Sequence, residues 1–220
     1  MLEYKLWIVF FFLAAIHVTA CFLNFYKIRV ATKPLLLIFL SVIYATSAAV
    51  FRPLVLTALL LGFAGDTLLL FGDRNKTFFF IGTAAFGAGH ITYLLSLISS
   101  VDIWGSLRLL VIAFVIIFVE PLFLFIKIKD GIPSKFRYPS ILYGVVITLM
   151  AAFSVTYLFS AQTTEALLIF CGMAFFVLSD SLLVYCMFGK KEQPPVYNGL
   201  IMLTYIAAQS LLTAGFILMK

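Results

Sequence analysis

Long apolar stretches of about 20 residues alternate with short polar segments along the whole chain. Each stretch is continuously apolar, which is typical of helices that cross about 30 Å of hydrocarbon and not of barrel strands. We therefore predict an all-α, polytopic transmembrane helix bundle of about eight spans with short loops, forming a single domain over 1–220. The predicted spans cover residues 6–25, 34–51, 54–71, 77–99, 107–126, 139–160, 166–188 and 198–219.

The composition supports this interpretation. Hydrophobic residues make up 64% of the chain and charged residues only 11%, whereas an ordinary soluble domain is roughly 45–50% apolar and about 25% charged. The polar surface is too small to coat a soluble globule, so we expect a lipid bilayer as the solvent. The loops are too short to hold a soluble domain, so the function must reside in the helix bundle or at its ends.

The net charge of +6 follows from membrane topology better than from binding to nucleic acid, and we expect neither nucleic acid nor an obligate protein partner. With eight spans, both termini lie on one side and the odd-numbered loops on the other. Those loops carry most of the basic residues, namely Lys27, Arg29, Lys33, Arg74, Lys76, Lys127, Lys129, Lys135, Arg137, Lys190 and Lys191. The positive-inside rule then places these loops in the cytoplasm and both termini outside it. The short loops favour a bacterial inner membrane.

Ionisable groups within apolar spans cost roughly 2.5–3.5 kcal/mol each to insert, so they call for an explanation. Asp66 follows Gly65 and Asp180 follows Ser179, and small residues allow close approach of a helix or a substrate. Alternating span directions bring these aspartates and other polar residues to similar depths in the cytoplasmic half of the bundle. We therefore predict one polar pocket there. Its candidate residues are Asn24, Lys33, Asp66, His90, Tyr93, Tyr143, Asp180, Tyr205 and Gln209.

Two further ionisable groups admit simpler interpretations. His17 is isolated, and an isolated histidine in a membrane span most often makes a hydrogen bond between helices. Glu120 precedes Pro121 near the end of a span, so it either caps the interface or belongs to the pocket. The three cysteines lie in apolar stretches and are expected to be small buried residues.

Ordered motifs resemble those of a known membrane-protein family, the YhhN-type lysoplasmalogenases. The fourth span contains Phe79-x-x-Gly82-x-x-x-Phe86-x-x-x-His90-x-x-Tyr93. The third contains Gly65-Asp66-x-x-Leu69, and the seventh contains Phe176-x-x-Ser179-Asp180-x-Leu182-Leu183. Lys33-Pro34 and Tyr205-x-x-x-Gln209 also match, so the resemblance covers nearly the whole chain in the expected order. One position departs from the pattern: members often have serine four residues before the third-span aspartate, where this chain has Gly62.

The resemblance implies an eight-helix membrane hydrolase that cleaves the vinyl ether bond of lysoplasmalogens. The products would be a fatty aldehyde and a glycerophospho-ethanolamine or -choline. The resemblance also points to Asp66 and Asp180 as the catalytic pair.

The chemistry of a vinyl ether suits two carboxyl groups. Protonation of the terminal alkene carbon gives an oxocarbenium ion, water adds to it, and the hemiacetal collapses to aldehyde and alcohol. One aspartate would donate the proton and the other would activate water, as two carboxyl groups do in glycoside hydrolysis; the sequence leaves open which does which. His90, Tyr93, Tyr205 and Gln209 would orient these groups, Tyr143 and Asn24 lie near them, and Lys33 would contact the substrate phosphate. No metal or cofactor is required.

Three alternatives remain. A small-solute or proton-coupled transporter would also use buried acids, and the two aspartates lie four spans apart like a faint repeat. A metal-dependent membrane hydrolase calls for about three histidine ligands to zinc, whereas this chain has two histidines. An intramembrane aspartyl protease would carry Gly-x-Gly-Asp, but Phe63-Ala64-Gly65-Asp66 lacks the first glycine.

Overall fold

The computed structural model describes residues 2–72, 75–189, 194 and 196–220. Arg74, Lys190 and Lys191, which entered the prediction of topology, lie outside the described residues. The described part of the chain is all-helical and contains no strand, which confirms the predicted fold class. Its helices are α1 (Leu2–Phe22), α2 (Tyr26–Ser47), α3 (Pro53–Leu69), α4 (Lys76–Ile98), α5 (Ile103–Ile128), α6 (Ser134–Ala161), α7 (Thr164–Phe188) and α8 (Val196–Leu218).

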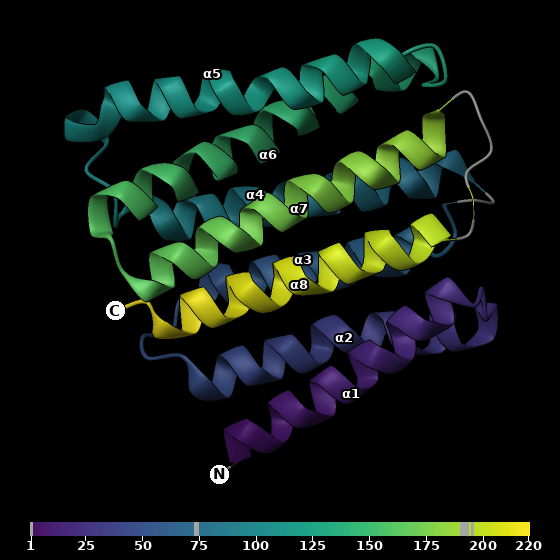
Figure 1. Ribbon diagram of the computed structural model, residues 1–220, viewed down its shortest axis with the longest axis horizontal. Helices are drawn as coiled ribbons and strands as arrows, with labels where there is room; N and C mark the ends of the chain where they lie inside the picture. Colours follow the sequence, from purple (N-terminus) through teal and green to yellow (C-terminus); the bar gives the residue numbers. More distant parts are fainter. Residues whose placement is uncertain (1, 73–74, 190–193, 195) are drawn as a thin grey trace.

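The helices run back and forth along one common direction, so both termini lie at the same end of the bundle (Figure 1). Each helix packs against the next as a hairpin in the pairs α1–α2, α3–α4, α5–α6 and α7–α8. In the view of Figure 1, α3 and α4 lie behind α7 and α8, while α5–α6 and α1–α2 flank this centre on opposite sides. Contacts of α6 with α4 and of α2 with α3 and α8 join the flanks to the centre.

Seven of the described helices are long and apolar enough to cross a membrane, as expected for a multi-pass membrane protein. The remaining one, α3, is apolar but has 17 residues. At 1.5 Å per residue it is about 26 Å long, somewhat less than the hydrocarbon thickness. Because α3 ends at Leu69, Asp66 lies within one turn of its end.

Each described helix begins before its predicted span, with the largest difference at α2. The segment 27–33, expected to be a loop, belongs to α2, and Pro34 lies inside that helix. Proline is tolerated inside membrane helices because neighbouring groups satisfy the freed backbone carbonyl. Similarly, α6 begins at Ser134 with Pro139 inside it. The start of α5 at Ile103 is fixed by Asp102, whose side chain accepts a hydrogen bond from the backbone N–H of Gly105 at 3.1 Å.

A close approach of α3 and α4 determines where Asp66 lies. A Cβ atom added to Gly65 would be 2.8 Å from the Phe86 ring and 3.1 Å from the carbonyl oxygen of Gly82. A Cβ atom added to Gly82 would be 3.1 Å from the carbonyl oxygen of Gly65. The two glycines therefore allow backbone contact, and this contact holds the end of α3 against α4 next to the aspartate.

Candidate active site

Asp66 is buried between α2, α3 and α8, with 1% of its surface exposed. Its Oδ1 atom lies 3.3 Å from the Nζ atom of Lys33, which is 14% exposed. Its Oδ2 atom accepts a hydrogen bond of 2.8 Å from the hydroxyl of Tyr205. Lys33, expected at the lip of the pocket facing a substrate phosphate, thus points inward and pairs with the carboxylate.

A series of polar side chains extends from Asp66 toward the C-terminal end of α8. The side chain of Gln209 lies beside the Tyr205 hydroxyl, which donates to Asp66. The Gln209 Oε1 atom in turn accepts from the hydroxyl of Tyr93, at 3.3 Å. The structure therefore brings four of the candidate residues into one buried network: Lys33 and Tyr205 contact the carboxyl group, and Gln209 and Tyr93 support the tyrosine.

Gly62, the position that departs from the family pattern, lies beside this network. A Cβ atom added there would be 3.6 Å from the Nε2 atom of Gln209 and 3.3 Å from the side chain of Leu37. A serine at this position would therefore lie next to the amide group. In this chain, Gln209 lies beside Tyr205 although position 62 carries no serine.

Asp180 is partly buried on α7 and faces α6, where its Oδ2 atom accepts a hydrogen bond from the hydroxyl of Tyr143. Tyr143 lies about two and a half turns from the start of α6, and Asp180 about two turns from the end of α7. Because the two helices are antiparallel, these distances bring the groups to one depth. This matching depth was the basis on which the sequence suggested Tyr143.

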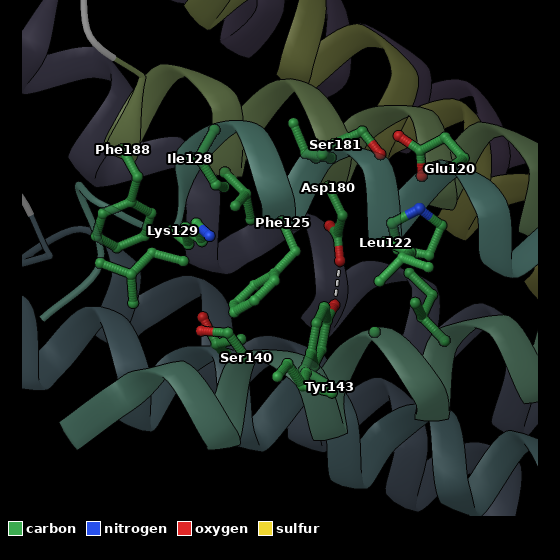
Figure 2. Close-up of a pocket in the computed structure, with 18 of the residues that line it drawn as sticks. Glu120, Leu122, Phe125, Ile128, Lys129, Ser140, Tyr143, Asp180, Ser181 and Phe188 are labelled. Atoms are coloured by element: carbon green, nitrogen blue, oxygen red, sulfur yellow. Dashed lines mark hydrogen bonds between the residues drawn. The ribbon is translucent and has the colours of Figure 1, made fainter. Parts of the chain in front are cut away.

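The Asp180–Tyr143 pair lies in a cavity of about 260 Å³ between α4, α5, α6 and α7. Most of the lining is apolar, with Phe125, Ile128 and Phe188 among the larger side chains. Figure 2 shows the hydrogen-bonded pair in the middle of the cavity, with Lys129 and Phe188 toward one end and Glu120 and Ser181 toward the other. A mostly apolar cavity with a few polar groups is typical of a site for a small or lipidic ligand.

Ring contacts connect His90 to the tyrosine partners of both carboxyl groups, directly to Tyr143 and through Phe176 to Tyr205. The His90 ring packs edge-on against Phe176 with centroids 4.3 Å apart, and its centroid is 6.3 Å from that of Tyr143. Phe176 in turn contacts the ring of Tyr205, at 5.7 Å. His90 is 2% exposed, yet neither of its ring nitrogens has a hydrogen-bond partner among the described residues. Buried polar atoms are nearly always satisfied, so this imidazole is available to a water molecule or a ligand.

Asp66 is not among the residues that line the cavity. The site thus has two parts. One is an ion-paired aspartate held by Lys33 and Tyr205, and the other is an aspartate that faces an apolar cavity with a tyrosine as its partner. Ring contacts of Phe176 with Tyr205 and with His90, and of His90 with Tyr143, connect the two parts.

Two residues considered from the sequence lie apart from this site. Asn24 occupies the exposed turn between α1 and α2 with a φ of 55°, a left-handed conformation that asparagine adopts more readily than most residues. Its side chain accepts a hydrogen bond from Arg29 at 3.1 Å. His17 is buried, and its Nδ1 atom lies 2.6 Å from the hydroxyl oxygen of Thr32, which fits the expected contact between helices.

The sequence did not identify Lys129 as a residue of the cavity. Its charge indicated a loop, whereas it is the C-cap residue of α5 and lines the cavity. Glu120, for which the sequence left the interface and the pocket open, lines the cavity, as does Pro121. Because α5 is apolar nearly all round, no pattern in the sequence marks the face that carries these residues. Among the described residues, no group of three or more His, Cys, Asp or Glu side chains is arranged to hold a metal ion.

The fold and the site together define an all-helical protein that has the helices of a multi-pass membrane protein, with two carboxyl groups inside the bundle. A family model matches residues 28–216, from the start of α2 nearly to the end of α8. The chain belongs to the YhhN family. Comparisons with curated proteins and with solved structures gave no match.

Proposed function

We propose that this protein is a lysoplasmalogenase, an integral membrane hydrolase that cleaves the vinyl ether bond of lysoplasmalogens. The observation that carries the proposal is Asp180, which is hydrogen-bonded to Tyr143 inside a mostly apolar cavity and is connected to a second buried aspartate through the ring contacts of His90 and Phe176. The apolar lining suits an alkenyl chain, and the carboxyl group suits the acid chemistry that a vinyl ether requires. Membership of the YhhN family agrees with the resemblance seen in the sequence motifs.

The different surroundings of the two aspartates divide their roles. The ammonium group of Lys33 stabilises Asp66 as a carboxylate. Asp180 has no cationic partner among the described residues and faces apolar groups, which favour the neutral carboxylic acid. We therefore assign Asp180 as the proton donor and Asp66 as the carboxylate that activates water.

The reaction then runs in three steps. Asp180 transfers its proton to the terminal alkene carbon, and the oxygen-bearing carbon becomes the centre of an oxocarbenium ion. Water adds to that carbon and gives up a proton to Asp66, forming a hemiacetal. The hemiacetal hydroxyl proton passes to the glycerol oxygen as the carbon–oxygen bond breaks, which releases aldehyde and alcohol. Proton exchange through water returns the proton from Asp66 to Asp180.

Neighbouring polar groups have supporting roles in this scheme. Tyr143 and Tyr205 orient the two carboxyl groups through their hydroxyls. The two free ring nitrogens of His90 provide hydrogen-bond sites for the attacking water between the aspartates. Gln209 and Tyr93 keep Tyr205 in place. The scheme uses no metal or cofactor.

A comparison of two lipids tests this function. Purified protein is incubated with an alkenyl lysophospholipid and with its saturated alkyl analogue, and released aldehyde is measured. We expect aldehyde from the alkenyl lipid only, because only the vinyl ether forms the cation by protonation. The variants D180N and D66N should each lose nearly all activity while eluting as the same species in detergent. Aldehyde release by both variants at the wild-type rate would rule out the mechanism.

The transporter alternative is addressed by the same preparation. If the wild-type protein in proteoliposomes moves a solute or protons and releases no aldehyde from any alkenyl lipid, the hydrolase assignment is wrong.

A further inference from the structure

The cavity contains a single lysine among the described residues that line it, Lys129. As the C-cap of α5, Lys129 is fixed by the hydrogen bond from its backbone N–H to the carbonyl oxygen of Phe125, at 2.8 Å. In Figure 2 its side chain lies between Phe188 and the Asp180–Tyr143 pair. The Lys129 side chain is exposed and lines the cavity at the end of the bundle where α5 ends and α6 begins.

The ammonium group of Lys129 has no ionic, hydrogen-bonding or aromatic partner among the described residues. Neighbouring lysines differ in this respect. Lys127 lies 4.3 Å from the ring centroid of Phe123, and Lys135 lies 4.8 Å from that of Phe136. Neither of these two lysines lines the cavity. Lys33 is already paired with Asp66, and Lys76 lies 5.8 Å from the ring centroid of Phe188 without lining the cavity. Among the described residues that line the cavity, Lys129 is therefore the cation available to an anionic ligand.

The order of groups along the cavity fits a lysophospholipid. Lys129, Phe188 and Asp180 line the same cavity, and Asp180 and Phe188 are about two turns apart on α7, or about 12 Å along the helix axis. In the lipid, the phosphate is separated from the vinyl ether by the three glycerol carbons and two oxygens, which extend to roughly 6–8 Å at about 1.5 Å per bond. A phosphate bound by Lys129 would thus place the alkene carbons near Asp180, with the alkenyl chain directed toward the apolar remainder of the cavity.

We infer that Lys129 binds the phosphate of the lysophospholipid substrate and thereby sets the position of the vinyl ether relative to Asp180. This inference rests on the proposed hydrolase function. It assigns to Lys129 the contact that the sequence had suggested for Lys33. A lysine is suited to this contact because a phosphodiester carries one negative charge and the site faces the headgroup region at the end of the bundle.

The kinetic test compares K129Q with the matched control K127Q on two substrates. One substrate is an alkenyl lysophospholipid and the other is the corresponding alkenylglycerol, which lacks the phosphate. We expect K129Q to raise KM for the phospholipid at least tenfold with kcat changed less than twofold, and to leave both constants for the alkenylglycerol unchanged. K127Q should behave like wild type. The inference is overturned if K129Q and K127Q give the same KM, or if K129Q weakens both substrates equally.

A binding measurement separates this inference from the proposed function. The saturated alkyl lysophospholipid lacks the reactive bond, and we expect it to raise the thermal unfolding temperature of wild type and K127Q but not of K129Q. Aldehyde release that is insensitive to K129Q would reject the phosphate site and leave the hydrolase intact. Stabilisation that depends on Lys129, with no aldehyde from any alkenyl lipid, would reject the hydrolase instead. Equal protection by inorganic phosphate alone would contradict assignment of the site to a lipid.

Discussion

Asp66 and Asp180 are the same residue type with different partners, and this difference defines the proposed site. Asp66 is paired with an ammonium group and a tyrosine hydroxyl, whereas Asp180 has a tyrosine hydroxyl and an apolar cavity. Two carboxyl groups in unlike surroundings can act as acid and base in one reaction. In the proposed mechanism, the ion pair with Lys33 keeps Asp66 as the carboxylate, and it also joins α2 to α3.

Removal of Lys33 should destabilise the protein because it leaves Asp66 buried without a counter-charge. We expect K33A to lower the free energy of unfolding by about 3–5 kcal/mol, the usual cost of breaking a buried pair from one side. The double variant K33M/D66N, which removes both charges, should recover much of that loss. Thermal unfolding in detergent measures the difference. Equal unfolding temperatures for K33A and wild type would show that the pair contributes nothing to stability.

At the level of elements, the sequence predicted where the helices lie more accurately than the residues at which they begin and end. Continuous apolar runs indicated where helices pass through the bundle, but the predicted spans 34–51 and 139–160 start at Pro34 and Pro139, which lie inside helices. One consequence concerns Lys33, which was expected to contact a substrate phosphate but lies about two turns inside α2 and pairs with Asp66. Helix direction alone placed Tyr143 and Asp180 at similar depths, and the structure joins them by a hydrogen bond.

The side-chain partners could not be derived from the sequence. Which face of α5 turns toward α6 and α7 depends on packing between helices, and α5 is apolar nearly all round. A uniformly apolar helix has no pattern that distinguishes its inner face. For this reason the sequence predicted Lys129 only as a charged residue of a loop. Asn24 was predicted to belong to the site, although it occupies an exposed turn.

The contact between Gly65 and Gly82 leads to a prediction about how α3 packs against α4. G82A would place a Cβ atom 3.1 Å from the carbonyl oxygen of Gly65. We therefore expect α3 and α4 to separate slightly, with a loss of about 1–3 kcal/mol in stability. G144A is the matched control, because its Cβ would meet Pro121 at an ordinary 3.6 Å. It should be neutral or stabilising, since alanine favours a helix over glycine by about 1 kcal/mol. Unfolding temperatures of the two variants in detergent provide the comparison, and equal effects would contradict this account of the crossing.

On the scale of the whole molecule, the ends of the bundle differ in charge, and this difference predicts its orientation in the membrane. Lys127, Lys129, Lys135 and Arg137 lie at the end opposite both termini (Figure 1). By the positive-inside rule this end faces the cytoplasm. The cavity that holds Asp180 then lies in the half of the bundle that adjoins the inner leaflet.

Cysteine labelling tests that orientation. Ser134, the first residue of α6, and Ser99, at the end of α4, are both exposed and lie at opposite ends of the bundle. In a background with the natural cysteines replaced, a membrane-impermeant thiol reagent should label S99C in intact cells and S134C only after permeabilisation. The reverse pattern would place both termini in the cytoplasm and the cavity in the outer leaflet.

The central claim is that Asp180 initiates the reaction by protonating carbon. The most direct test is hydrolysis of an alkenyl lysophospholipid in D₂O, followed by mass spectrometry of the aldehyde. The account predicts one deuterium on the carbon next to the aldehyde group, with authentic aldehyde incubated alongside to correct for later exchange. An aldehyde with no deuterium at that carbon beyond the exchange control would contradict it.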